Sequence, residues 1–311
     1  MRTFVAFLLF SSFALHGQAP KRPRITGIGH VAFGVTDMAK ARDFYTGLLG
    51  YEEAFQLINP DGKLRLAFFK VNDAQFIELF PNVKPASDKL QHFAFTTDDA
   101  KGMRAYLASR GVRVPPSVRK GRIGDWSFIV DDPDRHGVEF RQYAAGSETM
   151  RVMGKHLGNR RISTRLRHVG ILCGNLEASL RFYRDILGFR EAWRGSNSGT
   201  ELSWVNLQVP DGEDYIELML YKKLPPPKER TSHHHVCLEV PDVEQAAALL
   251  KESPGRKGYK RAIETRVGTN RRRQLNLFDP DGTRIELMEP QTIDGKPAPP
   301  STAPPPKRTR P

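Results

Sequence analysis

Residues 41–51 read ARDFYTGLLGY, and the same pattern returns in residues 179–189 as SLRFYRDILGF. The offset of 138 also relates the segment beginning at His30 to the segment beginning at His168. Two shorter repeats follow in the same order: QFIEL at 75–79 with DYIEL at 214–218, and DPD at 132–134 with DPD at 279–281. Repeats that keep one order along a chain indicate two halves with one shared fold.

Each half divides again into two units. In the first half, residues 30–35 and 92–97 are short apolar segments that begin with His, and each runs into Asp residues typical of a helix start. Residues 38–49 then place apolar side chains at spacings of three and four, and Gly50 predicts the helix end. Apolar segments of strand length follow. The sequence therefore predicts an α+β fold of four βαβββ units.

Composition sets the expected boundaries of the domains. We expect one domain over residues 25–143 and another over 165–290, each with two units and enough apolar residues for a core. Residues 144–164 lack the repeat and are expected to form a linker. Residues 291–311 hold seven prolines, which indicates an extended, disordered tail.

The N-terminus resembles a secretion signal. Met1 and Arg2 give a positive start, and residues 3–15 form an uncharged apolar run that is short for a bilayer. We expect residues 1–24 to be a signal peptide and short leader, with an uncleaved membrane anchor as the alternative. No second stretch approaches membrane length, so an exported protein, periplasmic or extracellular, without a transmembrane segment is predicted.

The net charge of +13 does not indicate a nucleic-acid-binding protein. Residues 1–24, 144–164 and 291–311 carry +4, +3 and +3, which leaves only +3 for the two domains. The excess charge therefore belongs to the ends and the linker, and no specific nucleic-acid partner is expected.

Eight metal-competent residues recur in phase with the units. They are His30, Glu78, His92 and Glu139 in the first half and His168, Glu217, His235 and Glu286 in the second. If two units pack as a cupped sheet with their first and last strands at its centre, the four residues of each half converge. Such a set of imidazoles and carboxylates suits Zn, Ni, Fe, Mn or Co. Whether units pair within one chain or between the chains of a homodimer is left open.

Each position also has a simpler explanation. A single His in an apolar strand is more often a core residue whose ring nitrogens are hydrogen-bonded. Only the recurrence of His and Glu favours metal binding. The run His233-His234-His235 leaves the register open, because His233 and His235 share a face of a strand. Cys173 and Cys237 fall on opposite faces relative to their neighbouring His residues, so a disulfide between them is not expected.

These motifs resemble the vicinal oxygen chelate superfamily of glyoxalases, bleomycin-resistance proteins and extradiol dioxygenases. The resemblance covers about residues 25–290 and implies two glyoxalase-like domains with cupped mixed sheets. Extradiol dioxygenases place a catalytic His near the position of Glu217 and a Tyr where this chain has Asn276 and Ile129. These departures favour a glyoxalase-like arrangement.

The resemblance implies a metal-dependent lyase or isomerase acting on a small substrate with vicinal oxygens through a metal-stabilised enediolate or enolate. The carboxylates of Glu139, Glu217 and Glu286 would move the proton on carbon. Arg122 and Arg271 precede the penultimate strands of their halves and are candidates to bind an anionic group, although a solvated loop also explains Arg271. The alternatives are an Fe(II) or Mn(II) extradiol-type dioxygenase and a non-catalytic protein that binds a small molecule or metal.

Overall fold

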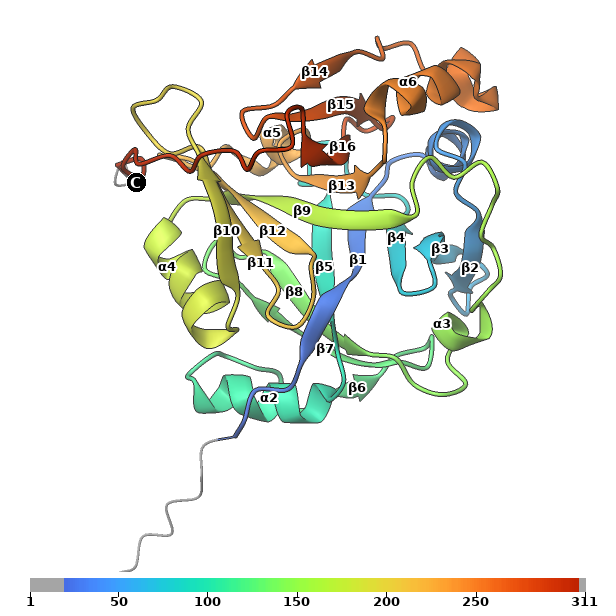
Figure 1. Cartoon of the computed structure of the whole chain (residues 1–311). Coiled ribbons are helices and arrows are strands. Elements are labelled where there is room, and N and C mark those ends of the chain that lie inside the picture. The colour runs from blue at the N-terminus through green and yellow to red at the C-terminus, as the bar shows by residue number, and fades with distance from the viewer. Residues whose placement is uncertain (1–19, 308–311) are drawn as a thin grey trace, which may run out of the picture.

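The structure is a computed structural model that describes residues 20–307 (Figure 1). Most of the expected signal segment, residues 1–19, lies outside this range. Among residues 20–307, every helix is too short or too polar to span a bilayer.

Both halves have the predicted order of elements. The first half contains β1 (Ile25–Gly34), α1 (Met38–Arg42), β2 (Glu53–Ile58), β3 (Leu64–Asn72), β4 (Gln75–Phe80), β5 (Leu90–Thr97), α2 (Ala100–Ser109), β6 (Arg119–Lys120), β7 (Trp126–Asp131) and β8 (Gly137–Gln142). After the short α3 (Glu148–Arg151), the second half contains β9 (Arg165–Cys173), α4 (Leu176–Leu180), β10 (Arg190–Gly195), β11 (Trp204–Gln208), β12 (Tyr215–Leu220), α5 (Pro227–Arg230), β13 (His235–Glu239), α6 (Val243–Glu252), β14 (Thr265–Val267), β15 (Arg272–Phe278) and β16 (Arg284–Thr292).

Each half forms one curled mixed sheet of eight strands. The strand order is β2-β3-β4-β1-β5-β8-β7-β6 in the first half and β10-β11-β12-β9-β13-β16-β15-β14 in the second. β1 and β5, the first strands of the two units, pair antiparallel, and each pairs in parallel with the last strand of its own unit. The predicted α+β fold with two glyoxalase-like cupped sheets is confirmed, and the units of each half pair within the chain.

Side-chain caps start the helices in both halves. Four residues accept hydrogen bonds from the backbone of the first helical turn: Asp37, Asp99, Asn175 and Asp242. α1 continues into a π-helical segment, Asp43–Leu48, in which Leu49 N donates to Phe44 O at 3.0 Å. Gly50 follows at φ 78°, a conformation that favours glycine and ends the helix.

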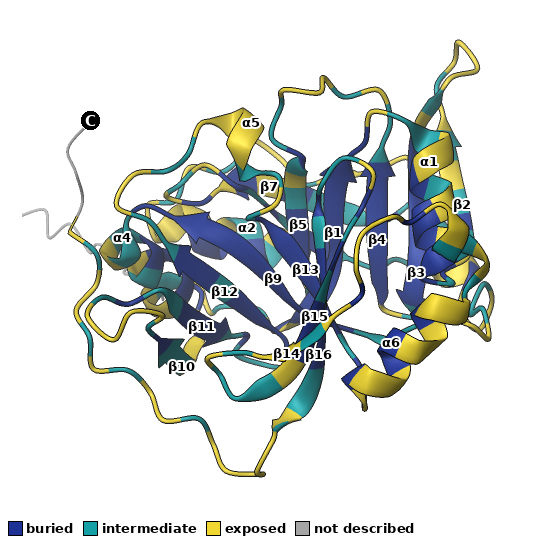
Figure 2. Ribbon diagram, turned by 90° about the horizontal axis from the view of Figure 1, so that it is seen from above, coloured by how far each residue is buried: buried dark blue, intermediate teal, exposed yellow. Residues whose placement is uncertain are grey.

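The repeated Phe-Tyr motif joins the two halves. The hydroxyl of Tyr45 donates to Asp279 of the second half at 3.2 Å, and Tyr183 donates to Asp132 of the first half at 2.9 Å. Both tyrosines are fully buried. Most of the central strands are buried as well, whereas α5 and α6 expose much of their surface (Figure 2). The interface is therefore built from equivalent residues used twice.

Two segments differ from the expected linker and tail. Residues 148–152 pack onto the first half, where Val152 lies in one apolar cluster with Phe68 and Phe76. The segment after β16 is ordered against the second half, because Ser301 N donates to Arg194 O at 2.9 Å and Leu202 N donates to Pro304 O at 2.8 Å. Over residues 293–307 the chain is thus not the free, disordered tail that its prolines suggested.

Candidate metal centres

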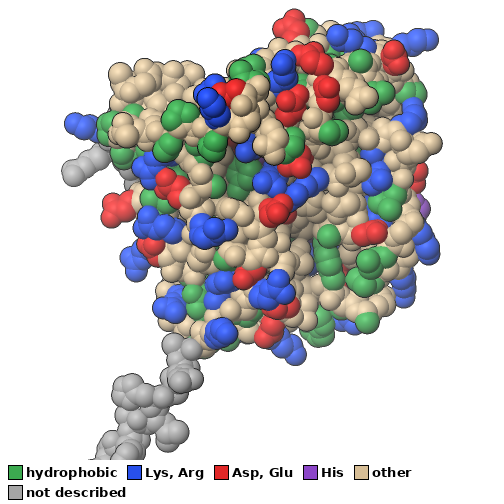
Figure 3. Space-filling view, viewed as in Figure 1, with side chains coloured by type: hydrophobic (Ala, Val, Ile, Leu, Met, Phe, Trp, Pro, Cys, Tyr) green, Lys and Arg blue, Asp and Glu red, His purple; other side chains and the backbone are tan. Residues whose placement is uncertain are grey.

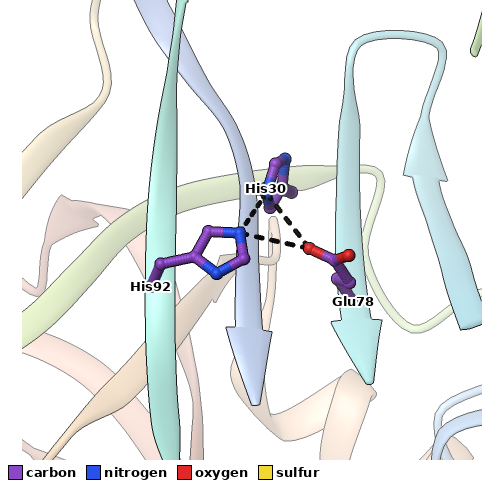
Figure 4. Close-up of side chains that lie close together, drawn as sticks. All are labelled: His30, Glu78 and His92. Carbon is purple, nitrogen blue, oxygen red and sulfur yellow. Dashed lines mark hydrogen bonds and ion pairs between the residues drawn. The ribbon is translucent and has the colours of Figure 1, made fainter. Parts of the chain in front are cut away.

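The first candidate centre lies at the middle of the first sheet (Figure 4). His30 on β1, Glu78 on β4 and His92 on β5 point toward one another. Glu139 on β8 completes the group. These strands are neighbours in the order β4-β1-β5-β8, and alternation along each strand sends the four side chains to one face. The predicted convergence is therefore present.

The donor atoms of this group are closely spaced. His30 Nε2 lies 2.9 Å from His92 Nε2, Glu78 Oε2 lies 3.3 and 3.2 Å from the two imidazoles, and Glu139 Oε2 lies 3.0 and 3.4 Å from them. Ligands about 2.0–2.1 Å from one ion lie about 2.8–3.4 Å apart at right or tetrahedral angles. The donor set and its spacing thus fit a divalent metal ion.

The second candidate centre repeats this arrangement on β9, β12, β13 and β16. His168 Nε2 lies 3.0 Å from His235 Nε2. Glu286 Oε2 lies 3.3 Å from His168 and 3.7 Å from His235, and Glu217 Oε1 lies 3.5 Å from His235. The same residue types can hold a metal here, with wider spacing than in the first centre.

The structure also decides the register of the histidine run. His235 begins β13 and reaches the centre. His233 instead bonds to the hydroxyl of Tyr221 at 2.7 Å, and His234 is buried beside Asp88 at 3.4 Å. Only His235 of the run joins the second centre.

Known proteins resemble the chain in sequence and structure. A family model described as the Glyoxalase/Bleomycin resistance protein/Dioxygenase superfamily matches residues 27–140 and 165–287. The chain belongs to this superfamily. The uncharacterized protein YwbC of Bacillus subtilis is 26% identical over 127 residues, 37% of this chain and 96% of that protein. The uncharacterized protein YaeR of Escherichia coli is 31% identical over 133 residues, 39% of this chain and 93% of that protein.

Solved structures of the superfamily share the two-sheet fold. The Mn(II)-bound glyoxalase of Novosphingobium aromaticivorans has a TM-score of 0.66 at 19% identity, covering 91% of this chain and 89% of the glyoxalase. Homoprotocatechuate 2,3-dioxygenase of Brevibacterium fuscum, in an anaerobic complex with 3,4-dihydroxyphenylacetate, has a TM-score of 0.63 at 22% identity, covering 93% and 87%. At these identities the likeness establishes the fold and leaves the reaction open.

Each of the two centres of this superfamily member lies beside a cavity. A cavity of about 220 Å³ lies at the first centre, and Leu57, Phe68 and Phe80 give it an apolar wall. A smaller cavity of about 60 Å³ at the second centre is lined by Trp193, Asn270 and other polar residues. A neighbouring cavity of about 260 Å³ shares Trp193 and Asn270 with it. Each centre therefore adjoins space for a small molecule, with different surroundings.

Burial and charge shift the acid–base groups of the first centre in opposite directions. Burial lowers the pKa of His30, although Glu139 partly opposes this shift. Burial would also lower the pKa of His92, but hydrogen bonds to Glu139 and Glu78 outweigh it and raise that pKa to about 10. The pKa of Glu139 falls well below its usual value because hydrogen bonds from both histidines outweigh its burial. Without a metal, the group is held by charged hydrogen bonds.

The two carboxylates of the second centre differ from each other. Burial raises the pKa of Glu217. Burial acts in the same way on Glu286, but a hydrogen bond with His168 and the charge of His235 lower its pKa to about 2. Glu217 is thus the carboxylate that more readily holds a proton, and Glu286 stays ionised.

Of the two arginines predicted to bind an anionic group, one lines a cavity at a centre and the other does not. Arg122 lines the cavity of the first centre, where its guanidinium also bonds to the carbonyl of Ile58. The prediction for Arg271 is wrong: it occupies a turn with φ 61° and pairs with Asp294 at 2.5 Å, away from the second centre. Arg266 and Arg284 line the second centre instead.

Sequence reasoning missed two further arginines. Buried Arg141 donates from Nη1 to His30 Nδ1 at 3.1 Å and pairs with Asp125 at 2.7 Å. Arg284 donates from Nη2 to His235 Nδ1 at 2.5 Å. Each lies two residues from a predicted glutamate ligand on the same strand, so side-chain alternation could have pointed to both. Because arginine only donates, the neutral His30 ring carries its proton on Nε2 while the centre is metal-free.

Proposed function

We propose that this chain is a metal-dependent lyase or isomerase of the glyoxalase type that acts on a small substrate with two adjacent oxygens. One observation carries the proposal: in each half, two imidazoles and two carboxylates meet beside a cavity, with donor spacings that fit one metal ion in the first half and are wider in the second. A glyoxalase with bound Mn(II) has the same fold, which supports this assignment.

Eight residues would hold the metal ions: His30, Glu78, His92 and Glu139 in one half, and His168, Glu217, His235 and Glu286 in the other. A bound divalent ion, whether Zn, Ni, Fe, Mn or Co, supplies Lewis-acid stabilisation of negative charge on the substrate oxygens. Metal binding at Nε2 requires neutral imidazoles, so the proton of His30 would move from Nε2 to Nδ1, with Arg141 turning its N–H away, and the protonated ring of His92 would lose its Nε2 proton to solvent.

The carboxylates of the chain would transfer the proton at carbon. In the second half, Glu217 and Glu286 have pKa values pushed apart by burial and by the histidines, which is typical of groups with separate acid and base roles. Glu139 is the corresponding candidate in the first half. Arg122 lines the first cavity and would bind an anionic group of a substrate there.

Ring cleavage of the extradiol type is supported less well. Asn276 lies directly across from Glu286 on the neighbouring strand, where the dioxygenase pattern expects a tyrosine hydroxyl. Ile129 holds the equivalent place opposite Glu139 in the first half. Neither side chain can donate or accept a phenolic proton. A dioxygenase or a purely binding protein thus remains an outcome of the tests below.

We also propose that the protein works outside the cytoplasm. The support is the sequence of residues 1–24, with its positive start and apolar run. Glutathione is scarce there, so the substrate would be a different compound with vicinal oxygens. Fractionation of cells that express the full chain tests this proposal, and retention in the cytoplasm would refute it.

Elemental analysis of protein purified without added metal is the main test. We expect divalent metal, up to two ions per chain, with loss of one ion in His30→Ala/His92→Ala and of the other in His168→Ala/His235→Ala. Failure of both halves to contain or take up any divalent metal would overturn the proposed function.

Proton exchange tests the chemistry itself. Loaded protein should exchange the C–H proton next to a carbonyl in α-hydroxycarbonyl compounds with D₂O, as followed by NMR. Glu217→Gln should abolish exchange that depends on the second half, and Glu78→Gln is the matched change in the first half. Oxygen uptake with a catechol, without such exchange, would favour the dioxygenase instead.

A further inference from the structure

A buried thiol adjoins the second centre. Cys237 is fully buried on β13, two residues after His235 and on the same face. It lies directly opposite His168 on β9 and directly opposite Glu286 on β16. A ligand atom from each of these three residues lies within 4.8 Å of the others. The thiol therefore belongs to the same cluster as two of the proposed ligands.

We propose that Cys237 is a metal ligand of the second centre and makes it selective for ions that accept sulfur, such as Zn²⁺, Co²⁺ and Cd²⁺. The inference rests on the proposed function, because His168 and Glu286 serve in both ligand sets. Imidazole and carboxylate ligands also accept Mn²⁺, whereas a thiolate increases the preference for the softer ions.

The chemistry of this step balances without another reactant. The metal ion forms a bond to Sγ, and the thiol proton leaves to solvent.

The first half provides the natural comparison. Ala94 holds the equivalent position, directly opposite His30 on β1 and opposite Glu139 on β8. Its methyl group offers no ligand. The two centres thus share two histidines and two glutamates and differ by one sulfur, so the first centre should accept harder ions and the second should prefer softer ones.

The chain also contains a matched control thiol. Cys173 on β9 is buried like Cys237, but its Sγ contacts the hydroxyl of Ser179 at 3.4 Å. It is in none of the clusters of metal-competent groups found among residues 20–307. Removing it should leave both centres unchanged.

Cobalt spectroscopy of the full chain tests the proposal. Co²⁺ is added to metal-free, reduced protein, and absorption from thiolate-to-cobalt charge transfer is recorded in the near-ultraviolet. We expect this band in the native protein and in Cys173→Ser, and its loss in Cys237→Ser and Cys237→Ala. Zn²⁺ affinity of the second centre should fall at least roughly tenfold in Cys237→Ala, because the loss of a group that only supports a ligand already costs that much.

A variant that gains a charge-transfer band controls for the chance that the other variants lose the band by misfolding. Ala94→Cys should add a second charge-transfer band, assigned to the first centre because His30→Ala removes it. Cobalt bound at the second centre of native protein without the band, or a band that survives in Cys237→Ser, overturns the inference. So does Ala94→Cys with cobalt in the first centre and no new band. If no variant binds any metal, the proposed function itself fails.

Discussion

At the scale of single residues, the first centre depends on a buried ion pair behind its ligands. Arg141 and Asp125 are 2% and 1% exposed, and Asp125 Oδ2 accepts from Arg141 and from Thr149. Removing one partner of a buried pair leaves a charge without compensation. Alternation along β8 places Arg141 on the same face as Glu139, but its pairing with Asp125, 16 residues away, has no signal in the sequence.

Arg141→Met should therefore destabilise the protein by about 3–5 kcal/mol, measured by urea unfolding. Arg141→Met/Asp125→Leu should recover much of the loss, since no unpaired charge then remains. Arg184→Met removes an exposed pair with Asp185 and should have no measurable effect. Equal losses in the single and double variants would show that the packing of Arg141, rather than its charge, stabilises this region.

At the scale of elements, the repeat determined both the strands and the converging residues. His30 and His168 were correctly placed because a strand that begins each unit must lie beside the strand that ends it. Arg271 was misplaced because the turn before β15 turns its side chain toward Asp294. Turn conformations of this kind leave no periodic signal, so the ligands on the strands could be predicted and the side-chain direction of Arg271 could not.

The close approach of β9 and β13 gives a prediction for the second centre. Gly170 lies directly opposite His235, and a Cβ added there would overlap the imidazole ring. Gly170→Ala should displace the ring and weaken metal binding at the second centre at least about tenfold, in line with the loss of other supporting groups. Metal titration by calorimetry measures this effect.

Ala32 provides the control, because it lies opposite His92 at the equivalent place in the first half. Ala32→Gly adds space there and should leave binding at the second centre unchanged. Unaltered affinity in Gly170→Ala would mean that the His235 ring can move without cost to the centre.

At the scale of the whole molecule, the interface between the halves should respond to pH. Burial raises the pKa of Asp279 to about 6, although hydrogen bonds from the Thr283 backbone and from Tyr45 oppose the shift. A carboxyl group whose pKa is higher in the folded state stabilises the fold fully at pH values below its pKa in the unfolded chain. That stability is lost as the pH rises through about 6.

Asp279→Asn lacks this titration and isolates its effect. The unfolding free energy of the variant minus that of the native protein should increase by up to roughly 3 kcal/mol as the pH rises from 4 to 8, at about 1.4 kcal/mol per pKa unit. The increase comes from the native protein, which loses stability over this range. Chemical unfolding at each pH measures the difference. A difference that does not change with pH would contradict a buried, titrating Asp279.

Charged side chains of both signs are interspersed on one face of the molecule. On the face shown in Figure 3, basic and acidic side chains alternate without a continuous basic surface. The sequence assigned most of the net charge to the ends and the linker, but it could not show that parts of these segments pack on the domains. Hydrogen bonds to the backbone of an edge strand and a loop, such as those of Ser301 and Pro304, have no composition signal.

The ordered C-terminal segment borders a cavity beside the second centre. Gly295, Pro297 and Ala298 wall the cavity of about 260 Å³ that also contains Trp193 and adjoins the second centre. The segment reaches the end of β10 through Ser301, so it runs along one side of this space.

Deleting residues 293–311 should expose Trp193 and increase its quenching by acrylamide, measured with Trp126 and Trp204 replaced by Phe. Deleting only residues 308–311 keeps the described contacts and should leave quenching unchanged. Equal quenching in both deletions would mean that the segment does not shield the cavity, and entry of a substrate to the second half would then not depend on it.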